Sequence, residues 1–436
     1  MMTIIDAILK KVKSKSDAAE VFHLRNETTG CSWAADKLKL AETKETSGVA
    51  VRVIKDGKIG FFASNKVDDA DKIADIACEL VNYGSEFAGE LPSEYKPVDA
   101  DFFHESTAHA GAERLIEAGN GMMEKAKSAF HDAIYEGKLD RSIVHCTIAN
   151  SHGTRADFRK TLFGGFLWGS VTREGDVLNV FEYGNYNYLD NQPESFADST
   201  VQKLKNAVNV VKLHAGEYPC ILTPNGMDVF GVLETALNAR AVLKDLSPFK
   251  DKVGEKIFDE KVILVDDRLR DKMPGSQPVD DEGVTSQKTV LVENGILKSF
   301  IHDLHTAAKM NVAPTGNGER ASLNSGPKAG FTTFAINPGT KTLDEMISGI
   351  KKGVLIDNVM GAHQASAFSG DYSVNIGLGY VIEDGKIIGR FKDGMLAGNV
   401  FRMLKEQILE IGSEPKFVGI LFPPILFDRM TISTTG

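Results

Sequence analysis

Apolar side chains recur along the chain with two different spacings, which predict a mixture of strands and helices. Residues 21–25 and 32–39 alternate apolar and polar positions, as half-buried β-strands do. Residues 70–81 instead place apolar side chains three or four positions apart, which is the spacing of one helix face. Residues 1–13 show a similar amphipathic pattern, so helices are expected on both sides of the first strands.

Three Asn-Gly or Asp-Gly pairs predict tight β-hairpins. The pair at 56–57 lies between apolar runs at 49–54 and 59–63, and the pairs at 294–295 and 384–385 likewise have β-forming residues on both sides. Such pairs suit a two-residue hairpin turn because both turn positions need a positive φ. The likeness among the three segments barely exceeds the turn signal itself, so convergent turn chemistry and internal duplication both stay open.

The remainder of the chain extends this mixture. Residues 83–102 are polar, contain Gly and Pro, and are interpreted as a linker. Further helices are expected at residues 112–130, 197–213 and 227–243, and further strands at residues 142–149, 156–168, 177–183 and 218–222. We therefore predict a multi-domain α+β fold, in which antiparallel β-sheets and hairpins pack with helices, divided into segments 1–103, 104–215 and 216–436.

Composition and charge narrow the class of protein. Of the 436 residues, 42% are hydrophobic and 25% are charged, as expected for a globular protein with a large core. The net charge of −10 argues against a broad phosphate-binding surface, so no direct nucleic-acid binding is expected. No apolar run reaches the roughly 18 residues of a membrane helix, and the amphipathic N-terminal stretch lacks the apolar core of a signal peptide. The four cysteines are scattered without a CxxC pair, which favours a reducing compartment, and the cytoplasm is the expected location.

Residues 104–109 read His-Glu-Ser-Thr-Ala-His, in which two imidazoles flank a carboxylate and could bind a metal ion. The two histidines are five positions apart, which places them about 140° apart around a regular helix. Zinc-peptidase helices usually space them by four. Ser106 or Thr107 is also well placed to cap the helix expected from residue 112. We therefore interpret the stretch as a helix start with exposed polar residues, and keep a metallopeptidase site as the alternative.

Two further clusters contain residues that can bind metals or charged ligands. The acidic run 280–283 (Asp-Asp-Glu-Gly) precedes an expected strand and is interpreted as a solvated turn, with metal or amine recognition as the alternative. His302 and His305 are three positions apart, and on a helix they would share a face where, with Asp303, they could touch a metal ion. We interpret them as surface histidines, and the metal site is again the alternative.

Two glycine-containing stretches are candidate binding elements. Residues 314–320 form a Gly-rich loop without the Lys-Ser/Thr ending of a phosphate loop, and we expect a tight loop near a binding surface. Ser369, Gly370, Asp371 and Tyr372 precede the third hairpin. Gly370 could let a ligand backbone approach, and an exposed strand edge there could accept an extended peptide. The alternative is an ordinary loop with an Asx turn.

Several stretches occur in the order in which one known family has them. They are residues 278–284 (Pro-Val-Asp-Asp-Glu-Gly-Val), 293–297, 314–318, 369–373 and, near the end of the match, 397–399. Upstream, residues 47–53 and 150–153 are similar to the first and middle segments of the same family. On these motifs the chain resembles the TldD/PmbA family, also called the modulator-of-DNA-gyrase family. Several motifs in one order are more specific than any single motif, and the resemblance covers nearly the whole chain.

The resemblance implies an activity shared by two related subunits. The TldD type is a metallopeptidase with an H-E-x-x-x-H helix and a late Cys ligand. The PmbA type, also called TldE, lacks these ligands and helps to enclose a chamber in which small or unfolded peptides are cut. In this chain the corresponding helix, residues 230–235, reads Phe-Gly-Val-Leu-Glu-Thr. Residues 416–420 stand where the late Cys would be, and the last cysteine is Cys220, so the chain resembles the PmbA/TldE type.

Three hypotheses follow from the residues and the resemblance. The first is a cytoplasmic PmbA/TldE-like subunit without catalytic residues, metal ligands or a cofactor of its own, in which residues 369–372 help to hold a peptide. It would pair with a zinc-containing TldD-type subunit or with a second copy. The second is a self-sufficient homodimeric metallopeptidase with an atypical site at 104–109 or at His302 and His305. The family motif also spaces its histidines by five, so the spacing does not exclude a metal site at 104–109. Only the position of this stretch outside the last segment argues against such a site. The third is a gyrase-modulating binding protein.

Overall fold

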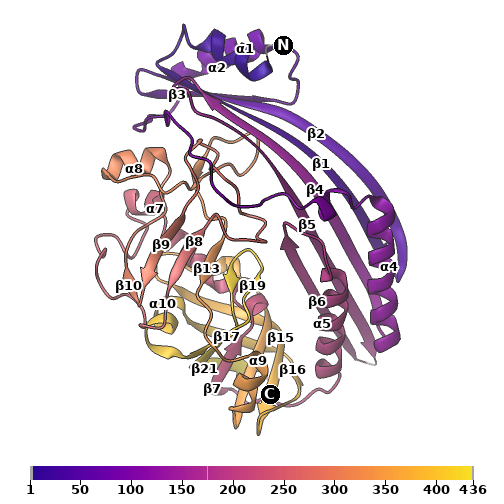
Figure 1. Cartoon of the computed structure of the whole chain (residues 1–436). Helices are drawn as coiled ribbons and strands as arrows, with labels where there is room; N and C mark the ends of the chain where they lie inside the picture. Colours follow the sequence, from indigo (N-terminus) through magenta and orange to yellow (C-terminus); the bar gives the residue numbers. More distant parts are fainter. Residues whose placement is uncertain (1–2, 174, 435–436) are drawn as a thin grey trace.

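The computed structural model describes residues 3–173 and 175–434, and it confirms the α+β class. A long curved sheet forms one side of the molecule, and a C-terminal part lies against its concave side (Figure 1). Met1 and Met2, which belong to the first helical pattern, lie outside the described residues.

The long sheet has six antiparallel strands in the order β3-β2-β1-β4-β5-β6. Their bounds are β1 (Ala18–Ala34), β2 (Lys37–Lys55), β3 (Lys58–Ser64), β4 (Ile134–Asn150), β5 (Arg155–Arg173) and β6 (Asp176–Tyr186). Four of these strands have 17 or 19 residues, and most of the shorter strands expected from the sequence are parts of longer ones. The single strand expected at 32–39 was wrong, because the chain turns at Ala35 and Asp36, which have positive φ values and join β1 to β2. Strands from both sides of residue 103 join in this one sheet, and the division into three segments stays a prediction.

Helices cover one face of the long sheet in two groups. The first group is α1 (Ile4–Val12) and α2 (Ala70–Leu80) with the 3₁₀ turn η1 (Val81–Tyr83), and the second is α4 (Ala112–Ala129) and α5 (Gln192–Ala207), with the short α3 (Glu105–Ala108) before it. Alternate residues of several strands are buried beneath them, such as Val21 under the first group and Leu167 under the second. Among the described helices, all are too short or too polar to cross a membrane.

The C-terminal part contains two larger sheets and one small strand pair. The first sheet has the order β10-β9-β8-β13-β20-β19, and the second has the order β14-β7-β21-β17-β15-β16 with β18 paired to β21. The strand bounds are β7 (Gly216–Leu222), β8 (Leu264–Asp267), β9 (Lys288–Glu293), β10 (Ile296–Leu297), β11 (Gly318–Glu319), β12 (Lys328–Ala329), β13 (Phe334–Ile336), β14 (Lys352–Met360), β15 (Asp371–Glu383), β16 (Lys386–Phe391), β17 (Gly394–Asn399), β18 (Ile408–Ile411), β19 (Lys416–Phe417), β20 (Leu421–Phe422) and β21 (Ile425–Thr434).

Short helices connect these strands. They are η2 (Pro224–Gly226), η3 (Asp228–Gly231), α6 (Val232–Ala236), α7 (Ala239–Leu243), α8 (Leu304–Met310), α9 (Leu343–Ser348), η4 (Ala362–Gln364), α10 (Val400–Arg402) and the π-helical η5 (Met403–Gln407). The single helix expected at 227–243 was wrong. Asn238 has an extended backbone, and its side chain accepts a hydrogen bond from the N–H of Arg240, so a new helix begins there.

The three predicted hairpins are confirmed. They join β2 to β3, β9 to β10 and β15 to β16. Asp56, Asn294 and Asp384 have φ values of 50°, 49° and 44°, and the glycine after each also has a positive φ. The turn chemistry was therefore enough to locate these connections from the sequence.

Candidate functional site

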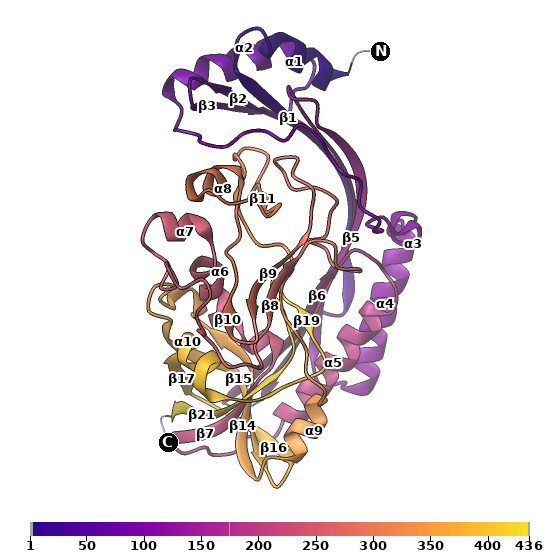
Figure 2. The same cartoon turned by 60° about the vertical axis from the view of Figure 1, so that its left-hand side comes forward.

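A groove of about 880 Å³ lies beside two of the predicted peptide-binding residues, Asp371 and Tyr372. Residues 248–257 form one wall, and residues 397–406 of β17, α10 and η5 form the other. Aromatic side chains, including that of Phe401, also line it. The groove is on the side of the C-terminal part away from the long sheet, where α10 and β17 are seen in both views (Figures 1 and 2).

The other two predicted residues hold the loop before β15 in place. The side-chain amide of Asn399 donates hydrogen bonds to the carbonyl of Ser369 at 2.7 Å and to the carboxylate of Asp371 at 2.8 Å. Gly370 has a φ of +80°, and a Cβ there would lie 2.6 Å from the ring of Phe401. The glycine therefore serves a close contact within the chain. The role of residues 369–372 in peptide binding stays a prediction.

The edge of β15 at this end is largely covered by the chain itself. On one side β17 pairs with Asp371 through Asn375, and on the other side β14 begins to pair at Asn375. The N–H of Ser366 donates to the carbonyl of Asp371 at 2.9 Å, so the loop before β15 occupies the start of that second edge. A peptide held here would consequently contact the groove's side chains more than it would extend the sheet.

The His-Glu-Ser-Thr-Ala-His stretch forms the single turn α3, with His104 and His109 at its two ends. The side chain of His109 is 80% exposed and lies 3.4 Å from the carboxylate of Glu105. The expected capping role of Ser106 or Thr107 was wrong, because the N-cap residue of α4 is Gly111 and no side chain caps the helix. The hydroxyl of Thr107 instead accepts a hydrogen bond from the N–H of residue 189 at 2.8 Å.

His302 and His305 do not share a helix, because α8 begins after Asp303, which caps it. The imidazole of His302 is buried, which corrects its interpretation as a surface histidine, and burial lowers its pKa. His305 accepts a hydrogen bond from the N–H of Ala88 at 3.3 Å. Within residues 3–173 and 175–434, no group of three or more His, Cys, Asp or Glu side chains has a geometry suited to a metal ion.

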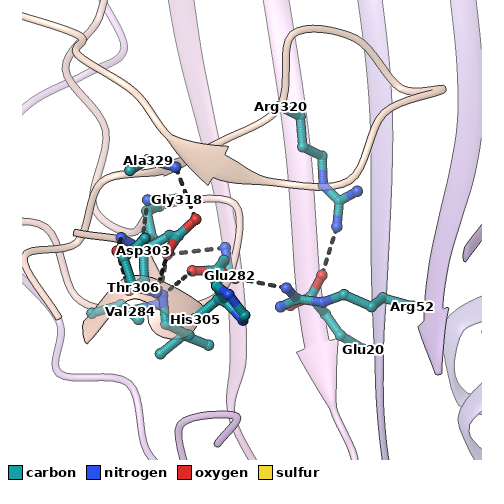
Figure 3. Close-up of polar contacts among 12 residues, drawn as sticks. Glu20, Arg52, Glu282, Val284, Asp303, His305, Thr306, Gly318, Arg320 and Ala329 are labelled. Carbon is teal, nitrogen blue, oxygen red and sulfur yellow. Dashed lines mark hydrogen bonds and ion pairs between the residues drawn. The ribbon is translucent and has the colours of Figure 1, made fainter. Parts of the chain in front are cut away.

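The acidic run 280–283 is buried, so its interpretation as a solvated turn was wrong. Its three carboxylate residues are at most 8% exposed. The carboxylate of Glu282 lies 2.6 Å from the guanidinium of Arg52 on β2, which also contacts Glu20 on β1 at 2.6 Å (Figure 3). Arg320 contacts the other oxygen of Glu20, also at 2.6 Å. These ion pairs join one end of the long sheet to the C-terminal part.

Backbone donors complete the surroundings of the acidic run. The carboxylate of Asp280 accepts hydrogen bonds from the N–H groups of Glu282, Val284 and Gly318 at 2.8–2.9 Å. Asp281 accepts one from the N–H of Arg320 at 2.8 Å. The Gly-rich loop 314–320, which we expected near a binding surface, therefore lies inside this cluster.

Negative charge exceeds positive charge in what we call the buried ionic network. It contains six carboxylates and four cations, namely Glu20, Asp266, Asp280, Asp281, Glu282, Glu319, Arg52, Lys160, Arg268 and Arg320. Burial raises the pKa of Asp280 and of Glu282, and it raises the pKa of Glu319 to about 7. Burial therefore favours the neutral, protonated forms of these carboxyls.

Residues 230–235, where the resemblance places a ligand helix, form the end of η3 and most of α6. Phe230 is fully buried, and its ring lies 6.0 Å from that of Phe422 and 6.1 Å from that of Phe427. Phe422 pairs with Lys416 across β19 and β20. Residues 230–235 and the segment around Lys416, which the resemblance identifies as the positions of the family's metal ligands, therefore lie close together. Aromatic rings fill the contact between them.

Lys416 also links the C-terminal part to the long sheet. Its ammonium forms an ion pair with Glu182 of β6, and Glu182 lies 3.0 Å from Lys203 of α5. Lys203 in turn lies 2.7 Å from Asp357 of β14. These residues belong to a pocket of about 580 Å³ between the two parts of the molecule. The charges of Glu182, Lys203, Asp357 and Lys416 are paired with one another.

Comparisons with known proteins agree with this architecture. The family model of the PmbA/TldA metallopeptidase C-terminal domain matches residues 215–434, and that of PmbA/TldA metallopeptidase domain 1 matches residues 19–82. The crystal structure of TldE from Thermococcus kodakarensis is 25% identical, with a TM-score of 0.91 over 99% of this chain and 100% of that chain. Fold and domain matches together define a metallopeptidase-related protein. The chain belongs to the PmbA/TldD metallopeptidase family.

Two curated relatives match over most of their length. An uncharacterized protein of Methanocaldococcus jannaschii is 29% identical over 93% of this chain and 94% of its own. A second protein of the same organism, described as a metalloprotease, is 26% identical over 91% of this chain and 90% of its own. Both likenesses extend through the long sheet and the C-terminal part, so the resemblance is not confined to single motifs.

Proposed function

We propose that this chain is the TldE-like, non-catalytic subunit of a two-subunit peptidase that acts on small or unfolded peptides. A TldD-type partner would supply the zinc. The observation that carries the proposal is the aromatic contact between residues 230–235 and the segment around Lys416. It occupies the place where, by family resemblance, a metallopeptidase member holds its ligands.

The side chains at this place do not fit zinc. A protein zinc site needs three or four nitrogen, sulfur or oxygen donors that converge on one point. At the positions of the motif's two histidines and its glutamate, this chain has Phe230, Thr235 and Gly231. Glu234 is the one carboxylate of the stretch, and burial raises its pKa, which favours the neutral form over the anion that would ligate a metal.

A second observation supports a partner of the same kind. On the face of the long sheet opposite α4 and α5, five exposed apolar side chains and the half-buried Phe181 form a group that we call the open face: Leu40, Ile134, Phe166, Trp168, Val177 and Phe181. The rings of Trp168 and Phe181 stack at 5.8 Å. Exposed apolar surface of this extent is typical of a protein–protein contact.

The strand edge beside the open face is also free within the described chain. β3 pairs with β2 only from Val49 to Lys55, and residues 37–46 of β2 are exposed. Unpaired edges of this length favour pairing with another chain unless they are covered. We therefore place the partner subunit on the open face and along this edge.

The catalytic proposal is tested with purified protein, alone and together with a TldD-type subunit. We expect no peptide cleavage and no stoichiometric zinc in the lone chain, as measured by elemental analysis, and cleavage by the mixture. A chelator should abolish the activity of the mixture. Zinc-dependent cleavage by the lone chain would overturn the proposal.

The docking proposal is tested with a matched pair of substitutions. Phe166→Ser removes a ring from the open face, whereas Phe368→Ser removes a ring that is 60% exposed in the loop before β15. We expect the first variant to lose co-elution with the partner in size-exclusion chromatography and the second to keep it. Loss of co-elution in both variants, or in neither, contradicts the assigned surface.

Two alternatives remain for direct tests. In a self-sufficient homodimeric metallopeptidase, His→Ala at 104 and 109 or at His302 and His305 would remove bound metal, and an unchanged metal content excludes it. In a gyrase-modulating protein, the chain would co-purify with gyrase and alter supercoiling. We favour neither, because each histidine pair described above contacts the surrounding chain and is not grouped with other donors.

A further inference from the structure

The groove lined by Asp371 and Tyr372 continues beyond α10. A second hollow of about 240 Å³ shares five of its lining residues, including Ala397, Gly398 and Arg402. It extends the groove as far as Arg429 of β21. The two hollows therefore form one channel across the surface of the C-terminal part, and Arg402 lies at their junction.

Three of the four cations that line the groove lack ion-pair partners among the described residues. Lys252 and Lys256 come from residues 248–257, Arg402 and Lys405 come from residues 397–406, and only Lys256 lies near a carboxylate, that of Glu260 at 3.9 Å. Among the described residues, no carboxylate oxygen lies within 4.0 Å of the charged nitrogens of Lys252, Arg402 or Lys405. Unpaired guanidinium and ammonium groups that face one groove are suited to carboxylate ligands.

Aromatic side chains also line the groove, where Phe401 is half-buried and Phe249 and Tyr372 are each 5% exposed. The rings of Phe249, Tyr372 and Phe401 line it, and the ammonium of Lys252 lies 5.9 Å from the centre of the Phe249 ring. Peptide-binding sites combine such apolar contacts with a few polar groups that fix orientation. The combination favours a ligand that alternates apolar and anionic groups.

We propose that this groove binds an extended acidic segment of a polypeptide, with carboxylates of the segment against Lys252, Arg402 and Lys405. The proposal rests on the proposed function, because it identifies the kind of peptide that this subunit would hold. Residues of β17 and α10 line the groove, and these elements lie on the side of the C-terminal part away from the long sheet (Figure 2), so a bound segment leaves the open face free for the partner.

The carboxylates of the groove distinguish a peptide from a nucleic acid. Glu217, Glu255, Asp371 and Glu406 line the same channel. A continuous phosphate backbone carries one charge on every nucleotide and would be repelled by them. A peptide can place its acidic side chains beside the cations and its neutral ones beside the carboxylates. The net charge of −10 on the whole chain acts in the same direction.

Fluorescence anisotropy of the lone, full-length chain tests the proposal. The probes are three labelled oligomers of equal length: a peptide that alternates Glu with Leu and Ala, the same peptide with Lys in place of Glu, and single-stranded DNA. We expect the acidic peptide to bind at least tenfold more tightly than the other two, and its affinity to fall as salt is raised.

Charge reversal at the junction identifies the site. Arg402→Glu and Lys405→Glu should each weaken the acidic peptide at least tenfold, whereas Lys13→Glu, an exposed lysine at the far end of the molecule, should change affinity less than twofold. Arg402→Gln should have an intermediate effect, and unchanged thermal melts establish that the variants are folded.

Equal binding of acidic and basic peptides overturns the proposal, and so does equal weakening by Lys13→Glu. Tighter binding of DNA reassigns the groove to a nucleic acid. Because no cleavage is measured, zinc-dependent activity of the lone chain would overturn the proposed function without changing these results.

Discussion

Arg52 is the central cation of the contact between the long sheet and the acidic run, and its removal is the sharpest test of the buried ionic network. Its guanidinium lies 2.6 Å from both Glu20 and Glu282, and the three side chains are 3%, 0% and 1% exposed. In Arg52→Ala, Glu20 keeps Arg320 at 2.6 Å. Glu282 keeps only the hydrogen bond from the N–H of Leu304 at 2.7 Å, so its buried charge loses its counter-ion.

The size of the effect follows from this uncompensated charge. Removing one partner of a buried ion pair costs about 3–5 kcal/mol. For a folding unit of about 200 residues, 1 kcal/mol shifts the melting midpoint by roughly 2–4 °C, so a loss of about 4 kcal/mol lowers it by about 8–16 °C. Arg114→Ala is the matched control, because its ion pair with Glu117 is at least 64% exposed on both sides and contributes at most about 1 kcal/mol.

The pH dependence separates lost charge compensation from lost packing. Burial raises the pKa of Glu282 and Arg52 opposes that rise, so the pKa increases further in Arg52→Ala. A carboxyl with a raised folded-state pKa is stabilised by proton uptake as pH falls toward that pKa. The loss of melting midpoint in Arg52→Ala, measured by differential scanning calorimetry, should therefore be smaller at pH 5 than at pH 7. The double variant Arg52→Ala/Glu282→Gln should recover part of this loss at pH 7. A double variant no more stable than Arg52→Ala refutes this reasoning.

Two further predictions concern a hairpin turn and a helix cap. Gly57→Ala and Gly295→Ala both place Ala at a φ of 70–76°, but the new Cβ meets nothing within 4 Å in the first and lies 2.2 Å from the carbonyl oxygen of Phe258 in the second. Urea unfolding should therefore show that backbone strain lowers the free energy of unfolding by about 1–3 kcal/mol in both variants. The total loss should be larger in Gly295→Ala, and equal losses in the two variants would contradict the clash. Burial acts to raise the pKa of Asp303, but Arg240 and the hydrogen bonds to the carboxylate hold it below 3.8. The stability that this lowered pKa provides is present above pH 3.8 and is lost as pH falls through the folded-state pKa. The loss of melting midpoint in Arg240→Ala should therefore shrink between pH 7 and pH 3. A loss that does not change with pH would exclude the charge effect.

Local chemistry made some elements predictable from the sequence. The Asp-Gly and Asn-Gly turns located three hairpins, and apolar spacing located α2 and α4 almost to the residue. The extent of the long strands was not predictable. Residues 41–46 of β2 are exposed and show no alternation of apolar and polar side chains, and they are extended because β1 pairs with them. Local sequence patterns do not show which strands pair, so they could not predict this pairing.

The buried ionic network was missed for a related reason. An Asp-Asp-Glu-Gly run has the composition of a surface turn, and what buries it is the end of the long sheet, more than 200 positions away in the sequence. A signal was present, however. Arg52 stands between Val51 and Val53 in a strongly apolar strand, and a lone charge in such a strand needs a partner. The aromatic contact of Phe230 was not predicted, because the resemblance identified the positions 230–235 and 416–420 and not the side chains that pack there.

Both ionic contacts between the two parts of the molecule are better suited to orientation than to stability. One joins Arg52 to Glu282, and the other runs from Lys416 through Glu182 to Lys203. Buried ion pairs recover little more than the cost of their desolvation, so apolar residues would hold the two parts together at least as well. Apolar contacts, however, tolerate small rotations, whereas a guanidinium between two carboxylates accepts one geometry. Since the open face lies on the long sheet and the groove lies on the C-terminal part, these contacts fix the orientation of the two proposed binding surfaces relative to each other.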